Sequence, residues 1–128
     1  MPGLTKCTND LRREAGVPVL RLNHSLQRAA LFKIQDVIKY QYWAHQNPVT
    51  GEYPWSLMDR AGYYYKEAGE NLAFGYDTTK EVCNAWRKSP GHLANITDTR
   101  YQDFGMAIRI VDLGLKRGIF VVQLFGKR

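Results

Sequence analysis

The spacing of apolar residues changes along this chain, and that change limits the folds available to it. Residues 23–40 carry apolar side chains every three to four positions, the period of one face of a helix. Residues 104–111 and 119–125 are instead rich in Ile, Val and Phe, which is typical of strands. A short connection at Gly114–Gly118 joins them as a hairpin. With helices first and a strand pair last, the sequence predicts an α+β fold, helices packed on a small antiparallel sheet.

Capping and turn residues divide the helical part of the chain. Thr78 and Glu81 have the spacing of a capping box, in which each side chain satisfies the backbone amide of the other residue. The segment that leads from Tyr63 to Glu70 has no clear period, so no element is assigned to it. The expected helices cover residues 4–14, 23–40, 54–61, 78–89 and 91–95.

Length and composition predict one domain over residues 1–128. Apolar residues make up 45% of the chain and charged residues 23%, which argues against disorder and supplies a hydrophobic core. No apolar run approaches the roughly 18 residues that span a bilayer, so we expect no transmembrane segment. The first residues also lack a basic segment followed by an apolar stretch, so we expect no signal peptide in this chain. The protein is then either cytoplasmic or the mature part of an exported protein.

The net charge of +6 raises the question of a nucleic-acid partner. The basic residues are scattered in pairs, without a basic–aromatic ladder or a zinc-finger spacing. We therefore expect no nucleic-acid recognition. A mild attraction to anionic lipid headgroups or acidic cell-wall polymers, weakened by salt, fits the charge better.

The two cysteines leave two interpretations open. Cys7 and Cys83 are too far apart in the sequence for a local metal clip or a redox CxxC pair. They are either two buried thiols or one disulfide that ties the first helix to a later one. The disulfide would suit an exported protein.

Two histidines and one glutamate lie in distinctive local sequences. The chain has three histidines in all, and two of them, His45 and His92, lie in the segments Tyr-Trp-Ala-His and Ser-Pro-Gly-His. Glu70 lies in Gly-Glu-Asn-Leu-Ala. Imidazoles and a carboxylate together can hold a divalent metal or perform acid–base chemistry near neutral pH.

These segments, in this order, resemble the CAP superfamily of cysteine-rich secretory proteins, antigen 5 and pathogenesis-related proteins, in its bacterial SCP-like branch. The resemblance covers essentially the whole chain, and Gly69–Ala73 is the most recognisable part of it. The other matching segments are residues 9–20, 44–48, 60–63, 86–96, 101–105 and 122–126.

The resemblance implies an α-β-α sandwich with a cleft lined by two His and two Glu. By motif, three of the four are His45, Glu70 and His92. The second acid of the family normally lies three residues after the helix tryptophan, Trp86, where this chain has Ser89. One acid of the set is therefore missing, which weakens any mechanism that needs two carboxylates.

Several chemistries remain open to these residues. His45 and His92 can bind Zn²⁺ or another divalent cation, with Glu70 orienting or deprotonating a bound water. Two protein ligands are fewer than the three usual in catalytic zinc sites, so such a site would be weak and exchangeable. Without a metal, either histidine can act as a general base whose tautomer Glu70 fixes. Ser89 is the one hydroxyl within these motifs that could serve as a nucleophile, and it is also well placed to end a helix before Pro90.

Three classes of function follow. The leading one is a secreted or surface-exposed domain, expected to be a monomer, whose cleft binds a small ligand, a lipid or a cell-envelope component. The second is a metal-assisted hydrolase or peptidase using the same cleft, so the sequence leaves open whether the protein is an enzyme. The third is an adhesion or signalling module that acts through its outer surface.

The remaining aromatic and polar residues have simpler interpretations. We expect most of the aromatic residues to form the core or the cleft wall, with a sugar- or lipid-stacking surface as the minority alternative. Asn95 is expected to hold the loop after His92, and His24 to be exposed. The aromatic residues in question are Trp43, Trp55, Trp86, Tyr63, Tyr64 and Tyr65.

Overall fold

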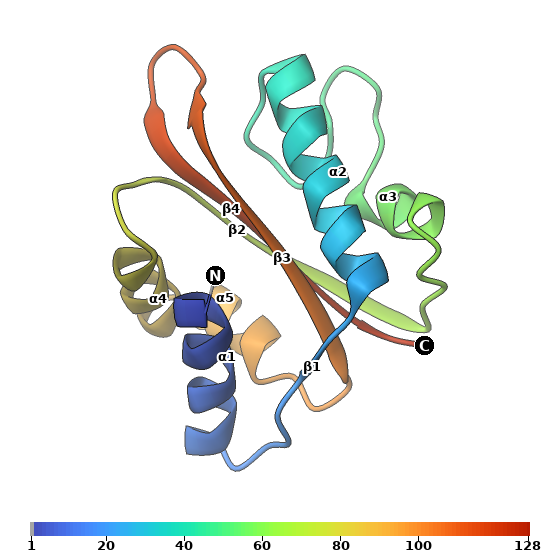
Figure 1. Ribbon diagram of the computed structural model, residues 1–128, viewed down its shortest axis with the longest axis vertical. Coiled ribbons are helices and arrows are strands. Elements are labelled where there is room, and N and C mark those ends of the chain that lie inside the picture. The colour runs from blue at the N-terminus through green and yellow to red at the C-terminus, as the bar shows by residue number, and fades with distance from the viewer. Residues whose placement is uncertain (1) are drawn as a thin grey trace.

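The structure, a computed structural model, describes residues 2–128 apart from the side chain of Pro2. A four-stranded sheet lies between two layers of helices, as Figure 1 shows. The helices are α1 (Pro2–Glu14), α2 (His24–Tyr40), α3 (Pro54–Arg60), α4 (Thr79–Lys88) and α5 (Pro90–Ile96). The strands are β1 (Arg21–Leu22), β2 (Glu67–Tyr76), β3 (Asp103–Asp112) and β4 (Arg117–Lys127).

The strand order across the sheet is β1-β3-β4-β2. The long strands β3 and β4 form an antiparallel hairpin, and β2 adds to the other side of β4, also antiparallel. The two-residue strand β1 pairs in parallel with the start of β3. The sheet therefore has β2 at one edge and β3, covered at one end by β1, at the other.

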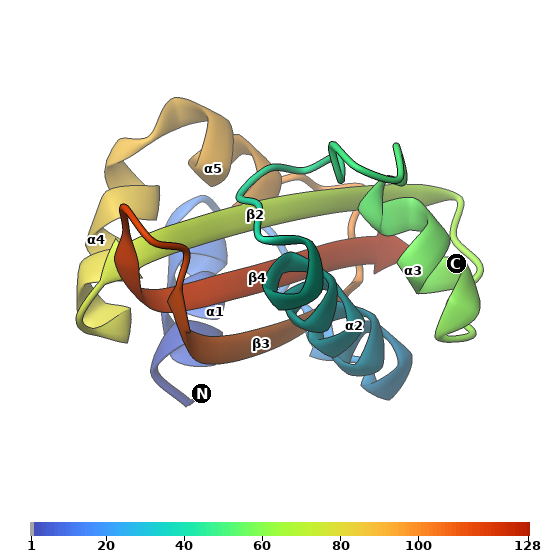
Figure 2. The same cartoon turned by 90° about the horizontal axis from the view of Figure 1, so that it is seen from above.

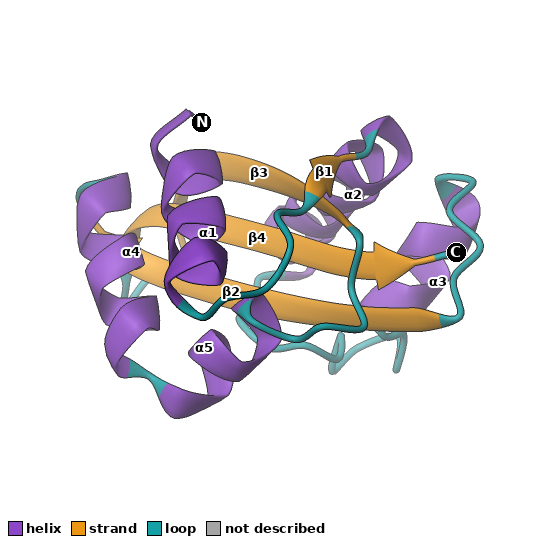
Figure 3. Ribbon diagram, turned by 90° about the horizontal axis from the view of Figure 1, so that it is seen from below, coloured by secondary structure: helices purple, strands orange, loops and turns teal. Residues whose placement is uncertain are grey.

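Each face of the sheet is covered by its own helices and has its own apolar cluster. Helices α2 and α3 cover one face, and Figure 2 shows α2 crossing it. Helices α1, α4 and α5 cover the opposite face, which Figure 3 shows from that side. We call these the α2 layer and the α1 layer. The expected α-β-α sandwich is confirmed.

A close backbone approach fixes α2 on the sheet. A Cβ atom at Gly105 would lie 2.3 Å from the backbone carbon of Leu26, a distance that no side chain tolerates. Gly105 therefore lets the first turn of α2 rest directly on β3. Asn23 caps this helix by accepting a hydrogen bond from the Leu26 amide, as the sequence predicted.

Two contacts hold the α1 layer together. Cys7 and Cys83 form a disulfide between α1 and α4, which settles the alternative left open by the sequence. The buried Arg12 guanidinium of α1 donates hydrogen bonds to the backbone carbonyls of Ile96 and Asp98, at the end of α5. Both contacts join α1 to helices far along the chain.

The structure differs from the sequence prediction mainly at the edge strands. The unassigned segment before Glu70 leads into β2, and β1 was not expected. The Glu81 amide donates to the Thr78 hydroxyl as in a capping box, but that hydroxyl donates in turn to the Glu81 carboxylate, so the cap closes between side chains. Ser89 lies between α4 and α5 without making a capping hydrogen bond through its side chain.

None of the helices described within residues 2–128 combines the length and the apolar run that a bilayer crossing requires.

Removing the disulfide is expected to destabilise the protein. The bond closes a loop with a sequence separation of 76, so its loss frees the unfolded chain and should lower the free energy of unfolding by about 2–4 kcal/mol. Urea unfolding of the wild type with and without reductant measures this effect. The Cys7→Ser/Cys83→Ser double variant should have the same free energy of unfolding as the reduced wild type, and the reductant should not change it. Equal stability of the oxidised and reduced protein would contradict the prediction.

Candidate functional site

Strand β2 places its side chains alternately in the two layers. Leu72 and Phe74 pack in the α2 layer, whereas Ala73 packs in the α1 layer. Because neighbouring side chains alternate across a strand, Glu70 faces the α2 layer and Asn71 the side of α5. The Gly-Glu-Asn sequence thus directs its acid and its amide to opposite faces of an edge strand.

His45, in the loop after α2, contacts Glu70 directly. The distance from His45 Nδ1 to Glu70 Oε1 is 2.6 Å. The Glu70 side chain is 1% exposed, whereas that of His45 is 60% exposed. When Glu70 is ionised, the Nδ1–H group donates to the carboxylate and Nε2 keeps its lone pair. His45 therefore presents an accessible nitrogen while its ring is held from behind.

The environment of Glu70 makes its carboxyl hold a proton more strongly than a free glutamate does. Burial raises the pKa of the Glu70 carboxyl, while the hydrogen bond from His45 and the charge of Lys33 act in the opposite direction. Oε2 is buried and makes no hydrogen bond to any residue in 2–128. A buried polar atom without a partner costs about 1–3 kcal/mol. This oxygen can therefore accept a proton or a hydrogen bond from a bound molecule.

Lys33 of α2 holds the His45 loop from inside the protein. Its ammonium group donates to the backbone carbonyls of Ala44, at 2.9 Å, and His45, at 2.6 Å. The group also lies 4.9 Å from the centre of the Tyr42 ring. Burial lowers the pKa of Lys33, and the charge of Glu70 opposes that shift. Lys33 thus fixes the backbone that carries His45 and balances the charge of Glu70.

His92 lies on α5, with its ring stacked on the indole of Trp86 at 5.9 Å between centroids. Its Nδ1 lies 2.7 Å from the Ser89 hydroxyl. Burial lowers the pKa of His92, and the nearby His45 lowers it further, while a backbone interaction with Leu72 opposes both. The neutral imidazole is therefore favoured near pH 7.

Side chains of the α1 layer and of the segment before β3 cover the outer edge of β2. The carbonyls of Ala68, Glu70 and Leu72 point out from this edge, and each accepts a hydrogen bond from a side chain. The donors, in the same order, are Tyr101, Asn95 and Trp86.

Asn95, which was expected to hold the loop after His92, lies within α5 and fixes that helix to β2. Its amide also donates to the Asn71 side chain, and Asn71 donates to the His92 carbonyl. Gly69 is required at its position because a Cβ there would lie 2.4 Å from the Tyr101 hydroxyl.

Two hollows lie along this edge, and the predicted residues divide between them. One, of about 270 Å³, is lined by His45 and Glu70 together with Trp55, Asn95 and Tyr101. The other, of about 360 Å³, is lined mainly by aromatic and apolar groups and contains His92. Its lining includes Trp43, Phe74, Tyr76, Trp86, Ser89 and Lys116.

The geometry brings His45 and Glu70 into contact and places His92 in the neighbouring hollow. Within residues 2–128, no three or more His, Cys, Asp or Glu side chains are grouped so that they could share a metal ion. His45 has the arrangement typical of a metal-binding histidine, with one ring nitrogen held by a carboxylate and the other free. A cation at this position would therefore depend on His45 and on whatever second ligand reaches it.

Most of the other residues singled out in the sequence lie as expected. Trp86 and Tyr63 are buried, and His24 is exposed. Trp43 and Trp55 form walls of the two hollows. Tyr64 is the exception, because it is 73% exposed and lines neither hollow.

Sequence reasoning missed Lys33 and Lys116. Lys33 is separated by three to four residues from apolar positions such as Ala30 and Val37, so a lysine on the buried face of a helix was the available signal. Lys116 lies in the hairpin and reaches Trp43, with its ammonium group 4.2 Å from the centre of the ring. No sequence pattern marks that contact, because it joins two segments far apart in the chain. Gly75, at the register shift of β2, leaves the space for the lysine, since a Cβ there would lie 2.3 Å from Lys116 Cε.

The sequence model of the cysteine-rich secretory protein family, CAP, matches residues 5–125. The chain belongs to the CAP family. This CAP domain is 35% identical over 124 residues to the uncharacterized protein YkwD of Bacillus subtilis, covering 97% of the domain and 46% of YkwD. It therefore spans less than half the length of that relative.

Solved structures share the CAP fold. An outer surface protein of Borrelia burgdorferi superposes with a TM-score of 0.83 at 25% identity, over 98% of this domain and 90% of that chain. An extracellular SCP-domain protein of Bacillus anthracis has a TM-score of 0.82 at 23% identity, over 100% of this domain and 40% of that chain. A manganese-bound structure of Ac-ASP-7 has a TM-score of 0.63 at 13% identity, over 98% of this domain and 66% of that chain, which shows the fold alone.

Replacing Glu70 by Gln should change how stability depends on pH. A carboxyl with a raised pKa in the folded protein keeps its proton after the unfolded chain has released it, so the wild type loses stability as pH rises through the pKa of Glu70. Gln does not ionise and still offers an oxygen to His45. The stability of Glu70→Gln relative to the wild type should therefore rise between about pH 4 and about pH 8. Urea unfolding at both values, with the exposed Glu14→Gln as control, measures this; an unchanged difference would contradict the raised pKa.

Replacing Lys33 by Met should loosen the His45 loop. Met keeps most of the buried volume but leaves the carbonyls of Ala44 and His45 unpaired, at a cost of about 1–3 kcal/mol. Chemical unfolding measures the loss, and the NMR signal of the His45 ring should shift as its contact with Glu70 weakens. Lys39→Met, on the exposed side of the same helix, should change neither. An unaltered His45 signal in Lys33→Met would show that the lysine does not position the loop.

Proposed function

We propose that this CAP domain binds a small amphipathic ligand in the cleft along β2. The apolar body of the ligand would lie in the aromatic hollow, and its polar group would reach the histidines. The observation that carries this proposal is the pairing of the two hollows: one is walled by aromatic rings, and the other presents His45 and the buried Glu70. Pockets that bind small molecules commonly combine an apolar lining with a few fixed polar groups.

The charges in the aromatic hollow favour an anionic polar group. Lys116 lies over Trp43 and forms no ion pair with any acid in residues 2–128. His92 is favoured in its neutral form and can donate or accept a hydrogen bond. A lipid-like carboxylate or phosphate would gain a charge-assisted contact with Lys116 while its chain covers the rings. This fits the cell-envelope ligand expected from the sequence.

A divalent cation is the second candidate for the polar part of the cleft. His45 offers a free nitrogen, and Glu70 lies behind it, where it fixes the ring and strengthens its basicity. The manganese bound to Ac-ASP-7 is a property of that protein, and it supports testing a cation here. With Zn²⁺ bound, the metal would supply Lewis-acid chemistry, and His45 would hold it through Nε2 while Nδ1–H donates a hydrogen bond to Glu70.

Hydrolysis remains the alternative use of the same residues. Ser89 and the neutral His92 are in hydrogen-bond contact, and Glu70 is held in a site that raises its pKa. A hydrolase would need activity that chelation removes and Zn²⁺ restores, or activity that Ser89→Ala abolishes. The binding proposal requires neither, and it is consistent with the replacement of the second family acid by Ser89.

The proposed location is outside the cytoplasm or on the cell surface. The disulfide is a bond of oxidising compartments, and two structural relatives are described as an outer surface protein and an extracellular protein. We propose a monomeric domain in that setting.

Dodecanoate tests the proposal, and dodecyltrimethylammonium serves as the charge-reversed probe. Isothermal titration should show binding of the anion to the wild type, and Lys116→Met should weaken it by about tenfold because the charge-assisted contact with the lysine is lost. Trp43→Ala should weaken the binding of both probes. Lys80→Met, on α4, should weaken the binding of neither. Equal affinity for the two probes, or binding that survives in both Lys116→Met and Trp43→Ala, would overturn the proposal.

Titration of Zn²⁺ into metal-stripped protein tests whether the cleft binds a divalent cation as well as, or in place of, an anionic amphipathic ligand. The His45→Ala/His92→Ala variant should lose the cation if the histidines hold it. If the variant leaves every metal and dodecanoate interaction of the wild type unchanged, the cleft is not the binding site.

A further inference from the structure

The edge of the sheet opposite the cleft is only partly covered. Strand β1 pairs with Asp103 and Phe104 alone, at the start of β3. One turn into α2, the Gln27 side chain accepts a hydrogen bond from the Met106 amide. Beyond Met106, no strand within residues 2–128 pairs with the outer edge of β3, and Figure 3 shows how short β1 is beside it.

The uncovered edge presents main-chain groups in the arrangement that pairs with a strand. In an antiparallel pair, alternate residues direct both their N–H and C=O groups away from the partner strand. The Phe104 carbonyl and the Met106 amide point away from β4, since the Asn23 amide and the Gln27 side chain bond to them from outside. By the same alternation Ile108 and Ile110 point outward. Among residues 2–128, the Ile108 carbonyl accepts only from the neighbouring Arg109 guanidinium, at 2.9 Å.

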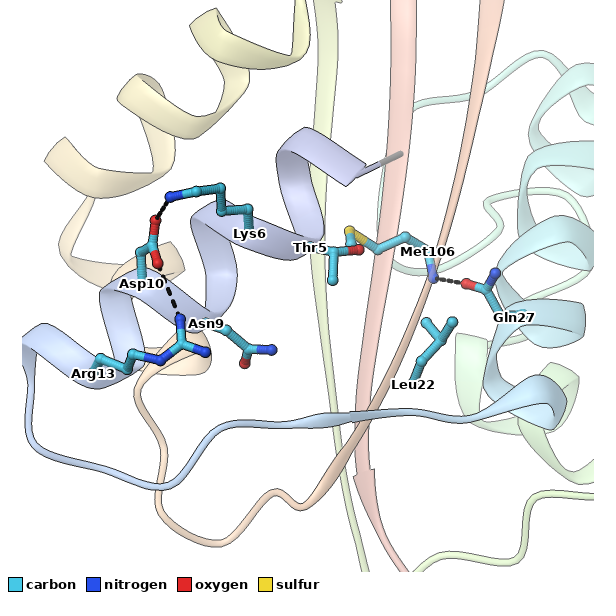
Figure 4. Close-up of a pocket in the computed structure, with 8 residues that line it drawn as sticks. All are labelled: Thr5, Lys6, Asn9, Asp10, Arg13, Leu22, Gln27 and Met106. Atoms are coloured by element: carbon cyan, nitrogen blue, oxygen red, sulfur yellow. Dashed lines mark hydrogen bonds and ion pairs between the residues drawn. The ribbon is translucent and has the colours of Figure 1, made fainter.

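A hollow lies on each side of this strand edge. The larger, of about 700 Å³, opens on the α1 face, and Figure 4 shows α1 along one wall with Leu22 and Met106 opposite it. The smaller, of about 380 Å³, opens on the α2 face. Its lining includes Arg28, Leu31, Ala107 and Arg109.

We propose that the free edge of β3 binds an extended peptide segment of a partner protein by strand addition. The backbone of the peptide would pair with Ile108 and Ile110, and its side chains would enter the two hollows alternately. An added strand directs successive side chains to opposite faces of the sheet, so a hollow on each face is the geometry that such a ligand requires.

The charges around the edge define the chemistry of the peptide. On the α2 face, Arg28 and Arg109 have no acidic partner among residues 2–128. On the α1 face, Lys6 and Arg13 already contact Asp10 (Figure 4). Acidic side chains are therefore favoured on the α2 face. On the α1 face the paired charges offer little attraction for an acid, and Leu22 and Met106 line the hollow, so apolar side chains are favoured there.

The same charges disfavour a second copy of this chain. Pairing of two β3 edges about a twofold axis would bring Arg109 of each copy close to the other, with Arg28 on the same face. Like charges placed opposite each other across a strand pair are destabilising. A segment that alternates apolar and acidic residues has no such conflict.

An octapeptide of alternating Val and Glu, blocked at both ends, is the test probe, with alternating Val and Lys as its control. The acidic peptide should bind to the whole chain, and the amides of Ile108 and Ile110 should become protected from hydrogen exchange. Arg109→Glu should weaken binding by about tenfold, since it reverses a charge at the contact. Lys80→Glu, the same reversal at an exposed position on α4, should change nothing, and neither should the cleft variant His45→Ala/His92→Ala.

Methylated peptides identify the hydrogen bonds. In antiparallel pairing, residues directly opposite each other share a face, so the Val amides would pair with β3 and the Glu amides would point to solvent. Methylation of the Val amides should abolish binding, while methylation of the Glu amides should preserve it. The reverse result would assign parallel pairing and also support strand addition.

Three outcomes would overturn the proposal. These are absence of binding up to about 1 mM peptide, binding that neither set of methyl groups affects, and equal binding of the Glu and Lys peptides. Self-association of the chain, seen in sedimentation together with protection of the Ile108 and Ile110 amides from hydrogen exchange, would replace the peptide with a second copy and equally overturn it.

Discussion

Burial of the Glu70 carboxylate is the constraint on which the arrangement of the cleft depends. A carboxylate with almost no exposure needs partners, because an isolated buried charge is too costly to keep. His45 supplies a hydrogen bond, and Lys33 supplies a positive charge and holds the loop that carries His45. The loop after α2 is thus tied to β2 through one acid. The second oxygen of that acid has no partner in residues 2–128, so the constraint also leaves a group available for chemistry.

The architecture could be predicted from the sequence because the local signals for helices and strands agree with the overall fold. The period of α2, the cap at Asn23 and the apolar strands at the end of the chain each specified their elements correctly. β2 was not assigned because most of its side chains are buried on both faces, which removes the alternation by which half-exposed strands are recognised. β1 is too short for any period.

The sequence predicted which residues form the candidate site, but it did not predict how they are arranged. His45, Glu70 and His92 were named from their local sequences, and the structure places the first two in contact with His92 in the adjoining hollow. Whether they bind a ligand stays a prediction. Lys116 could not be anticipated, since its approach to Trp43 depends on how a hairpin bends toward a loop about seventy residues earlier in the chain, a tertiary effect with no local signal.

The single disulfide has an uneven effect on the molecule. It joins α1 to α4, so the α1 layer is covalently tied, while α2 and α3 are held to the sheet by packing and hydrogen bonds without a covalent link. The two histidines therefore belong to layers that differ in covalent constraint. His92 lies on α5, in the layer that contains the disulfide, and His45 lies in the loop after α2, in the layer without one. A ligand that contacts both histidines would therefore link the layer that contains the disulfide to the layer that lacks one.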